Sequence, residues 1–120
     1  MNNKKQAYDQ LCATYEWNKA RNNNVLDWSL EAAMLQEELN EFLAATTDVD
    51  RLDALIDLKF VINGTLGKMG LSPSAMVDAY DVVLQANEQK SATLNEYGKV
   101  TKPADFVKPE PKLQQLLDER

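Results

Sequence analysis

The chain has 120 residues, 44% of them apolar and 27% charged, which fits one domain with a modest core. A formal net charge of −6 argues against a protein that binds nucleic acid through a broad basic face. The absence of histidine excludes Ser-His-Asp catalysis and the usual zinc sites, and the single cysteine excludes an intramolecular disulfide. Any catalysis must therefore rest on carboxylates, lysines or hydroxyls.

Helical spacing of apolar residues, interrupted by short polar turns, predicts an all-α chain. Asp27 or Ser29 is expected to cap the second helix and Asp48 the third, which Gly70 should end in a left-handed conformation. Pro73 suits the first turn of the fourth helix, where its missing N–H costs nothing. The helices are expected at about residues 5–20, 27–45, 49–69 and 73–90, followed by a turn at 95–99, an extended tail and a short helix at 113–117.

The third helix is apolar on two faces. One face carries Phe60 and Val61, and a separate stripe runs along the far side: Leu55, Leu58, Ile62, Leu66 and Met69. A helix of this kind is central in a bundle or lies at a subunit interface. We therefore expect a single domain at 1–120 with a four-helix-bundle-like core at about 26–91 and a tail at 92–120. Dimerisation should complete the core, in a homodimer or homotetramer.

No apolar run approaches the roughly 18 residues of a membrane span, and the polar N-terminus lacks an apolar signal core. We therefore expect a cytoplasmic protein that binds neither a membrane nor a nucleic acid. Small phosphorylated ligands remain compatible with the negative charge, because carboxylates that collect divalent cations invert the local charge.

Acidic residues interrupt the apolar faces of the second and third helices. Glu38 points the same way as Leu35 and Phe42, while Asp53 and Asp57 lie one turn apart on one face of the third helix. A buried ionised carboxylate needs a cation, a hydrogen-bond donor or a raised pKa. These acidic residues therefore indicate a functional site as an alternative to an ordinary solvated surface.

Antiparallel packing across the short connection at 46–48 would bring Glu38 and Glu41 opposite Asp53 and Asp57. A cluster of four carboxylates needs cations, and ligands that are all oxygen select Mg²⁺ or Mn²⁺ ahead of Zn²⁺. Because Mg²⁺ shares its shell with substrate phosphates, the pattern indicates metal-assisted attack on a phosphoanhydride. The alternative is an ordinary solvated acidic face on a non-catalytic helical adaptor.

Two segments carry a resemblance to a known superfamily. Residues 37–41, Glu-Glu-Leu-Asn-Glu, and residues 53–65, Asp-Ala-Leu-Ile-Asp-Leu-Lys-Phe-Val-Ile-Asn-Gly-Thr, resemble the MazG-like all-α pyrophosphohydrolases. That superfamily includes dimeric dUTPases and phosphoribosyl-ATP pyrophosphohydrolases. Its signature is Glu-x-x-Glu on one helix and Glu-x-x-Asp on the next, and Glu38 and Glu41 match the first half.

The second half of the signature departs from the superfamily pattern. Ala54 stands three residues before Asp57, where the pattern has Glu, and either Asp50 or Asp53 would replace it. The resemblance implies that one carboxylate positions the attacking water, with Glu37, Glu38 and Glu41 as the catalytic candidates. The metal ligands that it implies are Glu38, Glu41, Asp53 and Asp57.

The resemblance continues downstream, in the Asn-x-x-Lys segment at 87–90 and in Gly-Lys-Val-Thr-Lys-Pro at 98–103. It implies that Asn87 and Lys90 contact the sugar or phosphates of a nucleotide, with Lys99 and Lys102 as further contacts from the tail. The alternatives are a lysine near a helix C-terminus for Lys90 and simple surface solvation for the two tail lysines.

The activity implied by the resemblance is Mg²⁺-dependent hydrolysis of a nucleoside triphosphate, most simply a deoxynucleoside triphosphate, to a monophosphate and pyrophosphate. Mn²⁺ is the alternative metal. A phosphoribosyl-ATP substrate and the non-catalytic adaptor are the rival interpretations. Base and sugar preference do not follow from these residues.

Overall fold

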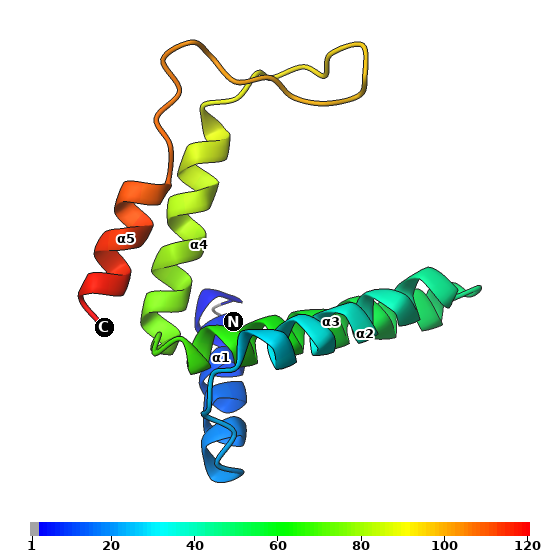
Figure 1. Ribbon diagram of the computed structural model, residues 1–120. Coiled ribbons are helices and arrows are strands. Elements are labelled where there is room, and N and C mark those ends of the chain that lie inside the picture. Colours follow the sequence, from blue (N-terminus) through cyan, green and yellow to red (C-terminus); the bar gives the residue numbers. More distant parts are fainter. Residues whose placement is uncertain (1–2) are drawn as a thin grey trace. The chain divides into compact units, whose positions relative to one another are not determined.

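The computed structural model describes residues 3–120, and over that range the chain is all-helical (Figure 1). Its contacts divide the chain into two compact units, a first unit that ends at Pro73 and a second unit from Ser74 to Arg120. The division falls within the segment expected as the core. The helices are α1 (Asn3–Ala20), α2 (Trp28–Ala44), α3 (Asp48–Lys68), α4 (Pro73–Glu88) and α5 (Glu110–Asp118).

In the first unit, α2 and α3 form an antiparallel hairpin joined by residues 45–47 (Figure 1). Asp27 caps α2, its carboxylate accepting from the backbone N–H groups of Ser29 and Leu30 at 3.0 and 3.3 Å. Thr47 caps α3 by accepting from the N–H of Asp50, so the predicted Asp48 cap is wrong by one residue. Gly70 follows α3 with φ 89°, as its predicted left-handed conformation requires.

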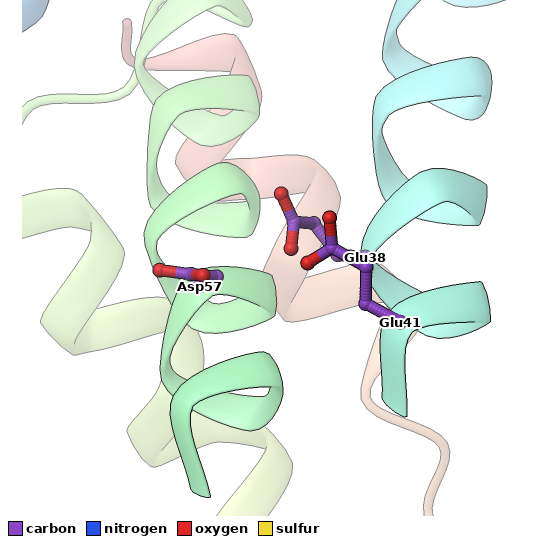
Figure 2. A group of neighbouring side chains, drawn as sticks. All are labelled: Glu38, Glu41 and Asp57. Carbon is purple, nitrogen blue, oxygen red and sulfur yellow. The ribbon is translucent and has the colours of Figure 1, made fainter. Parts of the chain in front are cut away.

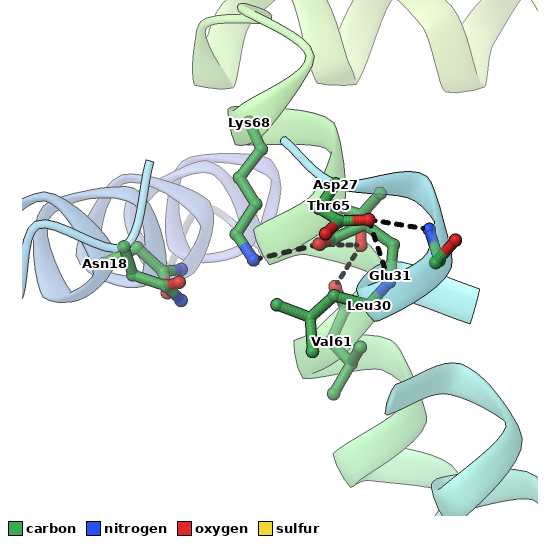
Figure 3. A network of polar contacts seen from close by, with 9 residues as sticks. Asn18, Asp27, Leu30, Glu31, Val61, Thr65 and Lys68 are labelled. Atoms are coloured by element: carbon green, nitrogen blue, oxygen red, sulfur yellow. Dashed lines mark hydrogen bonds and ion pairs between the residues drawn. The ribbon is translucent and has the colours of Figure 1, made fainter. Parts of the chain in front are cut away.

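The open end of this hairpin is closed by a buried ion pair between Lys68 and Glu31, which no local sequence pattern predicts (Figure 3). Lys68 Nζ lies 3.0 and 3.2 Å from the two carboxylate oxygens of Glu31, and the hydroxyl of Thr65 lies 3.0 Å from the first. Glu31 is 1% exposed. The pair joins the first turn of α2 to the last turn of α3, where the helix dipoles favour an acid and a base respectively.

Helix α1 packs on α3 in the same unit. The rings of Trp17 and Phe60 meet edge to face, with centroids 5.2 Å apart and an interplanar angle of 80°. Near this contact a Cβ on Gly64 would lie 3.4 Å from the side-chain nitrogen of Asn18, so α3 uses a glycine where α1 comes close. These contacts brace the helix that carries the aspartates.

The second unit consists of most of α4, a long tail segment and α5. Gln89 ties the tail to the end of α4, because its amide donates to the carbonyl of Val107 at 2.9 Å and accepts from the Val107 N–H at 2.8 Å. The predicted turn at 95–99 is present, with Gly98 at φ 75°. Helix α5 begins earlier than predicted, because Pro111 lies in its first turn and does not interrupt it.

None of the helices in the described range is long and apolar enough to cross a membrane.

Candidate active site

Helices α2 and α3 bring three carboxylates together (Figure 2). Glu38 and Glu41 lie three residues apart on α2 and therefore share a face, and Asp57 projects from α3. Each offers one oxygen, and these oxygens all lie within 4.8 Å of one another. The antiparallel pairing that brings Glu31 against Thr65 also places Glu38 level with Asp57. Glu38 lies seven residues further along α2 than Glu31, and Asp57 lies eight residues before Thr65 on α3, so the two steps cover nearly the same length of helix.

The environment of Glu38 is unfavourable for an ionised carboxylate. Its Oε2 atom is buried and has no hydrogen-bond partner among residues 3–120. Burial raises the pKa of Glu38, and the neighbouring carboxyl of Glu41 raises that pKa further, with smaller contributions from the charges of Asp57 and Glu37. Since ionised carboxylates are all acceptors, Glu38 and Glu41 can share a hydrogen bond only when one of them is protonated.

A divalent cation fits this arrangement better than a protein partner does. Within residues 3–120 the ion pairs join Lys5 to Asp9, Arg51 to Asp48 and Lys68 to Glu31, so none neutralises the three carboxylates. The donors are all oxygen, as hard cations such as Mg²⁺ and Mn²⁺ prefer. The buried oxygen of Glu38 that lacks a donor is the atom that a cation would satisfy.

Comparison with known proteins gives the family. The family model described as phosphoribosyl-ATP pyrophosphohydrolase matches residues 13–82, more than half of the chain. The chain belongs to the phosphoribosyl-ATP pyrophosphohydrolase family. This confirms the predicted MazG-like all-α superfamily and makes the protein a pyrophosphohydrolase with a nucleotide-type substrate. No curated protein and no solved structure matches the chain.

The match to the phosphoribosyl-ATP pyrophosphohydrolase family covers α2 and α3 completely, and so includes all three clustered carboxylates. Glu37 is exposed beside them, close enough for its charge to affect Glu38. Asp50 and Asp53 are exposed on α3 and lie outside the cluster, so a metal-binding role for Asp53 remains a prediction.

The residues predicted to contact substrate lie beyond the family match, in the second unit. Asn87, Lys90 and Lys102 line one hollow of about 730 Å³, whereas Lys99 does not. Other side chains in the same lining, among them Phe106 and Lys108, were not predicted from the sequence. The tail must fold back onto α4 to bring them there, and no helical period in the sequence indicates such a return.

Proposed function

We propose that the protein hydrolyses a nucleoside triphosphate, most simply a deoxynucleoside triphosphate, between the α- and β-phosphates and releases pyrophosphate. The observation that carries the proposal is the convergence of Glu38, Glu41 and Asp57 around a buried oxygen without a donor, on the two helices that the family match covers. Mg²⁺ is the proposed metal, with Mn²⁺ as the alternative, held by these three carboxylates and by Asp53.

Each carboxylate has a distinct part in the proposal. Glu38 and Asp57 are half-buried and serve as fixed metal ligands, while Glu41 is exposed and can face both metal and substrate. Glu37 is exposed next to the cluster and is the proposed group that orients the attacking water and accepts its proton, with Glu38 and Glu41 as the other catalytic candidates. A divalent cation bound there would polarise a phosphoryl oxygen and offset the charge that develops on the leaving pyrophosphate.

A phosphoribosyl-ATP substrate is the second candidate, and the description of the matching family favours it. The chemistry at the carboxylates would be the same, because the bond that breaks is again an α–β phosphoanhydride. Phosphoribosyl-ATP carries a second phosphoribosyl group on its adenine ring and a 2′-hydroxyl on its ribose, and a deoxynucleoside triphosphate lacks both. The two substrates should therefore be distinguished by contacts away from the three carboxylates.

We also propose that the working protein is a homodimer or homotetramer. The stripe on the far side of α3 supports this, since Leu55 is 47% and Ile62 is 42% exposed. Leu43 on α2 and Leu52 on α3 are more exposed still, at 71% and 59%. Exposed apolar residues along neighbouring helices are typical of a surface that a partner covers, and a second copy would bury them.

The test is the turnover of the Asp57→Asn variant on a panel of deoxynucleoside and nucleoside triphosphates and phosphoribosyl-ATP with millimolar Mg²⁺. Released pyrophosphate and phosphate are measured separately. Turnover should fall by more than about a hundredfold, beyond the loss expected for an outer-shell partner, while the helical circular dichroism spectrum is kept. Asp78→Asn, an exposed aspartate on α4, is the matched control.

The possible outcomes separate the alternatives. Pyrophosphate release that disappears with EDTA and with Asp57→Asn supports the proposal, and the panel identifies the substrate class. Equal activity of Asp57→Asn and Asp78→Asn would exclude a catalytic role for the cluster. No release from any substrate by a folded protein would favour the non-catalytic adaptor.

A further inference from the structure

Two aromatic rings lie on the helix face that carries Asp57, within the first unit of the chain. Asp57, Phe60 and Gly64 are spaced i, i+3 and i+7 on α3, so all three share one face of that helix. Helix α1 crosses this face at Gly64, where the side chain of Asn18 comes close (Figure 1). The ring of Trp17 therefore meets Phe60 next to the carboxylate cluster.

Both rings remain accessible to solvent although they contact each other. Trp17 is 43% exposed and Phe60 is 40% exposed. Asn18, in the same contact between α1 and α3, is only 8% exposed. The amide is thus buried while the neighbouring rings are left in solvent, which is the reverse of the usual order of burial. Aromatic surface that folding leaves open beside polar groups is typical of a ligand site.

A guanidinium group holds one of the two rings. Arg21 lies over the Trp17 ring at 4.0 Å from its centroid, and its Nη1 donates to the Trp17 carbonyl at 3.0 Å. Over the part of the chain that the structure describes, no carboxylate oxygen lies within 4.0 Å of this guanidinium, so an ion pair does not place it there. Arg21 therefore orders the indole before any ligand arrives, which lowers the entropic cost of stacking on it.

The position of the rings suits the base of a nucleotide. A metal on the three carboxylates would hold the phosphates, and a single sugar joins those phosphates to the base. The base must therefore lie close to the cluster, and Phe60 follows Asp57 by only about 4.5 Å along the axis of α3. Aromatic side chains bind bases by stacking, because every base has a flat π face.

We propose that Trp17 and Phe60 form the stacking surface for the base of the substrate, and that Arg21 is a positioning residue for the Trp17 ring. The inference rests on the proposed function, which supplies a nucleotide held at the carboxylates. Because stacking tolerates every base, this surface should favour a nucleotide over a bare polyphosphate and should discriminate only weakly among bases.

The first test compares two ligands with and without a base. Trp28→Leu removes the other tryptophan of the chain, so that fluorescence reports on Trp17 alone. With Mg²⁺, a non-hydrolysable deoxynucleoside triphosphate analogue should quench this fluorescence as it saturates the site, and inorganic triphosphate should bind without quenching. Equal quenching by the two ligands would overturn the proposal, as would no quenching by an analogue whose binding calorimetry detects.

The second test measures the affinity of both ligands for variants of the rings. Phe60→Leu and Trp17→Leu should each weaken binding of the analogue about tenfold, the loss expected for one base–aromatic contact. Binding of inorganic triphosphate should not change, and Trp17→Phe, which keeps a ring, should restore most of the affinity for the analogue. Trp28→Leu, the same change at an exposed tryptophan of α2, is the matched control.

Two results of this second test would show that the rings only join α1 to α3, and would overturn the proposal. One is equal weakening of both ligands by the ring variants. The other is an effect of Phe60→Leu and Trp17→Leu no larger than that of Trp28→Leu, in proteins that keep the helical circular dichroism spectrum.

The role of Arg21 has its own spectroscopic readout. Arg21→Gln should shift the emission maximum of Trp17 and should weaken binding of the analogue less than Phe60→Leu does. Arg21→Lys keeps a cation near the ring and should restore the emission. An unshifted emission maximum in Arg21→Gln would overturn the positioning role.

These outcomes do not depend on hydrolysis. If the analogue quenches Trp17 in a protein that releases no pyrophosphate from any substrate, the stacking surface is supported and only the proposed reaction fails. If the protein hydrolyses nucleotides with a KM that Phe60→Leu and Trp17→Leu leave unchanged, the proposed reaction is supported and the stacking surface fails.

Discussion

The buried ion pair between Glu31 and Lys68 allows a quantitative test of how the hairpin is held. Lys68→Met keeps a similar side-chain length but removes the ammonium group, so that the Glu31 carboxylate, 1% exposed, keeps only the Thr65 hydroxyl. Breaking a buried pair by removing one partner costs about 3–5 kcal/mol. For a chain of this length, that corresponds to a fall in Tm of about 10–25 °C.

The assay is thermal and urea unfolding followed by circular dichroism at pH 7. Arg51→Met is the control, because Arg51 pairs with Asp48 on the exposed surface of α3 and should lose less than about 1 kcal/mol. The double variant Glu31→Gln/Lys68→Met should recover most of the loss, since it leaves no buried charge and the amide can still accept from Thr65.

Equal losses for Lys68→Met and Arg51→Met would refute this reasoning. The result also concerns the active site, because Glu31 lies seven residues, or about 10 Å along α2, from Glu38. If Mg²⁺ binds the three carboxylates as proposed, it should raise the Tm of the wild-type protein, and loosening this end of the hairpin should reduce that rise.

Three further predictions follow from the charges and exposed surfaces. The pKa of Glu38 is raised in the metal-free folded protein. Between the ordinary glutamate pKa and this raised pKa, the folded state therefore binds more protons than the unfolded state. The free energy of unfolding should fall as pH rises through that window. Glu38→Gln should remove this slope in pH-dependent urea unfolding. Lys102→Gln should raise KM more than Lys99→Gln, because only Lys102 lines the hollow; equal effects in steady-state kinetics would contradict this. Leu55→Lys/Ile62→Lys should reduce the mass measured by light scattering to that of a monomer, and an unchanged mass would exclude this stripe as the interface.

Much of the fold could be predicted from local signals. Asp27, Gly70 and Pro73 act within a few residues of their own position, so the ends of the helices that they mark could be predicted. The cap of α3 was wrong by one residue, because Thr47 and Asp48 are adjacent and both can cap a helix. The clustering of Glu38 with Asp57 could also be predicted, because helical spacing and a short connection leave few ways to pair α2 with α3.

Features that depend on how the helices are rotated could not be predicted in the same way. Asp53 and Asp57 are four residues apart, which is 400° and leaves them about 40° apart around α3. The rotation of α3 about its own axis decides which of the two aspartates joins the cluster, and only packing sets that rotation. Glu31 was missed because its partner Lys68 is 37 residues away, beyond the reach of any periodic pattern.

The tie between Gln89 and Val107 makes residues 90–106 a loop whose two ends are fixed by a single side chain. The entropic free-energy cost of closing a loop rises only slowly with its length, by about 0.6 kcal/mol for each doubling. Insertions near the turn at 95–99 should therefore be tolerated without displacing Lys108. This segment is the natural place in the chain for length to vary, or for a reporter peptide to be inserted.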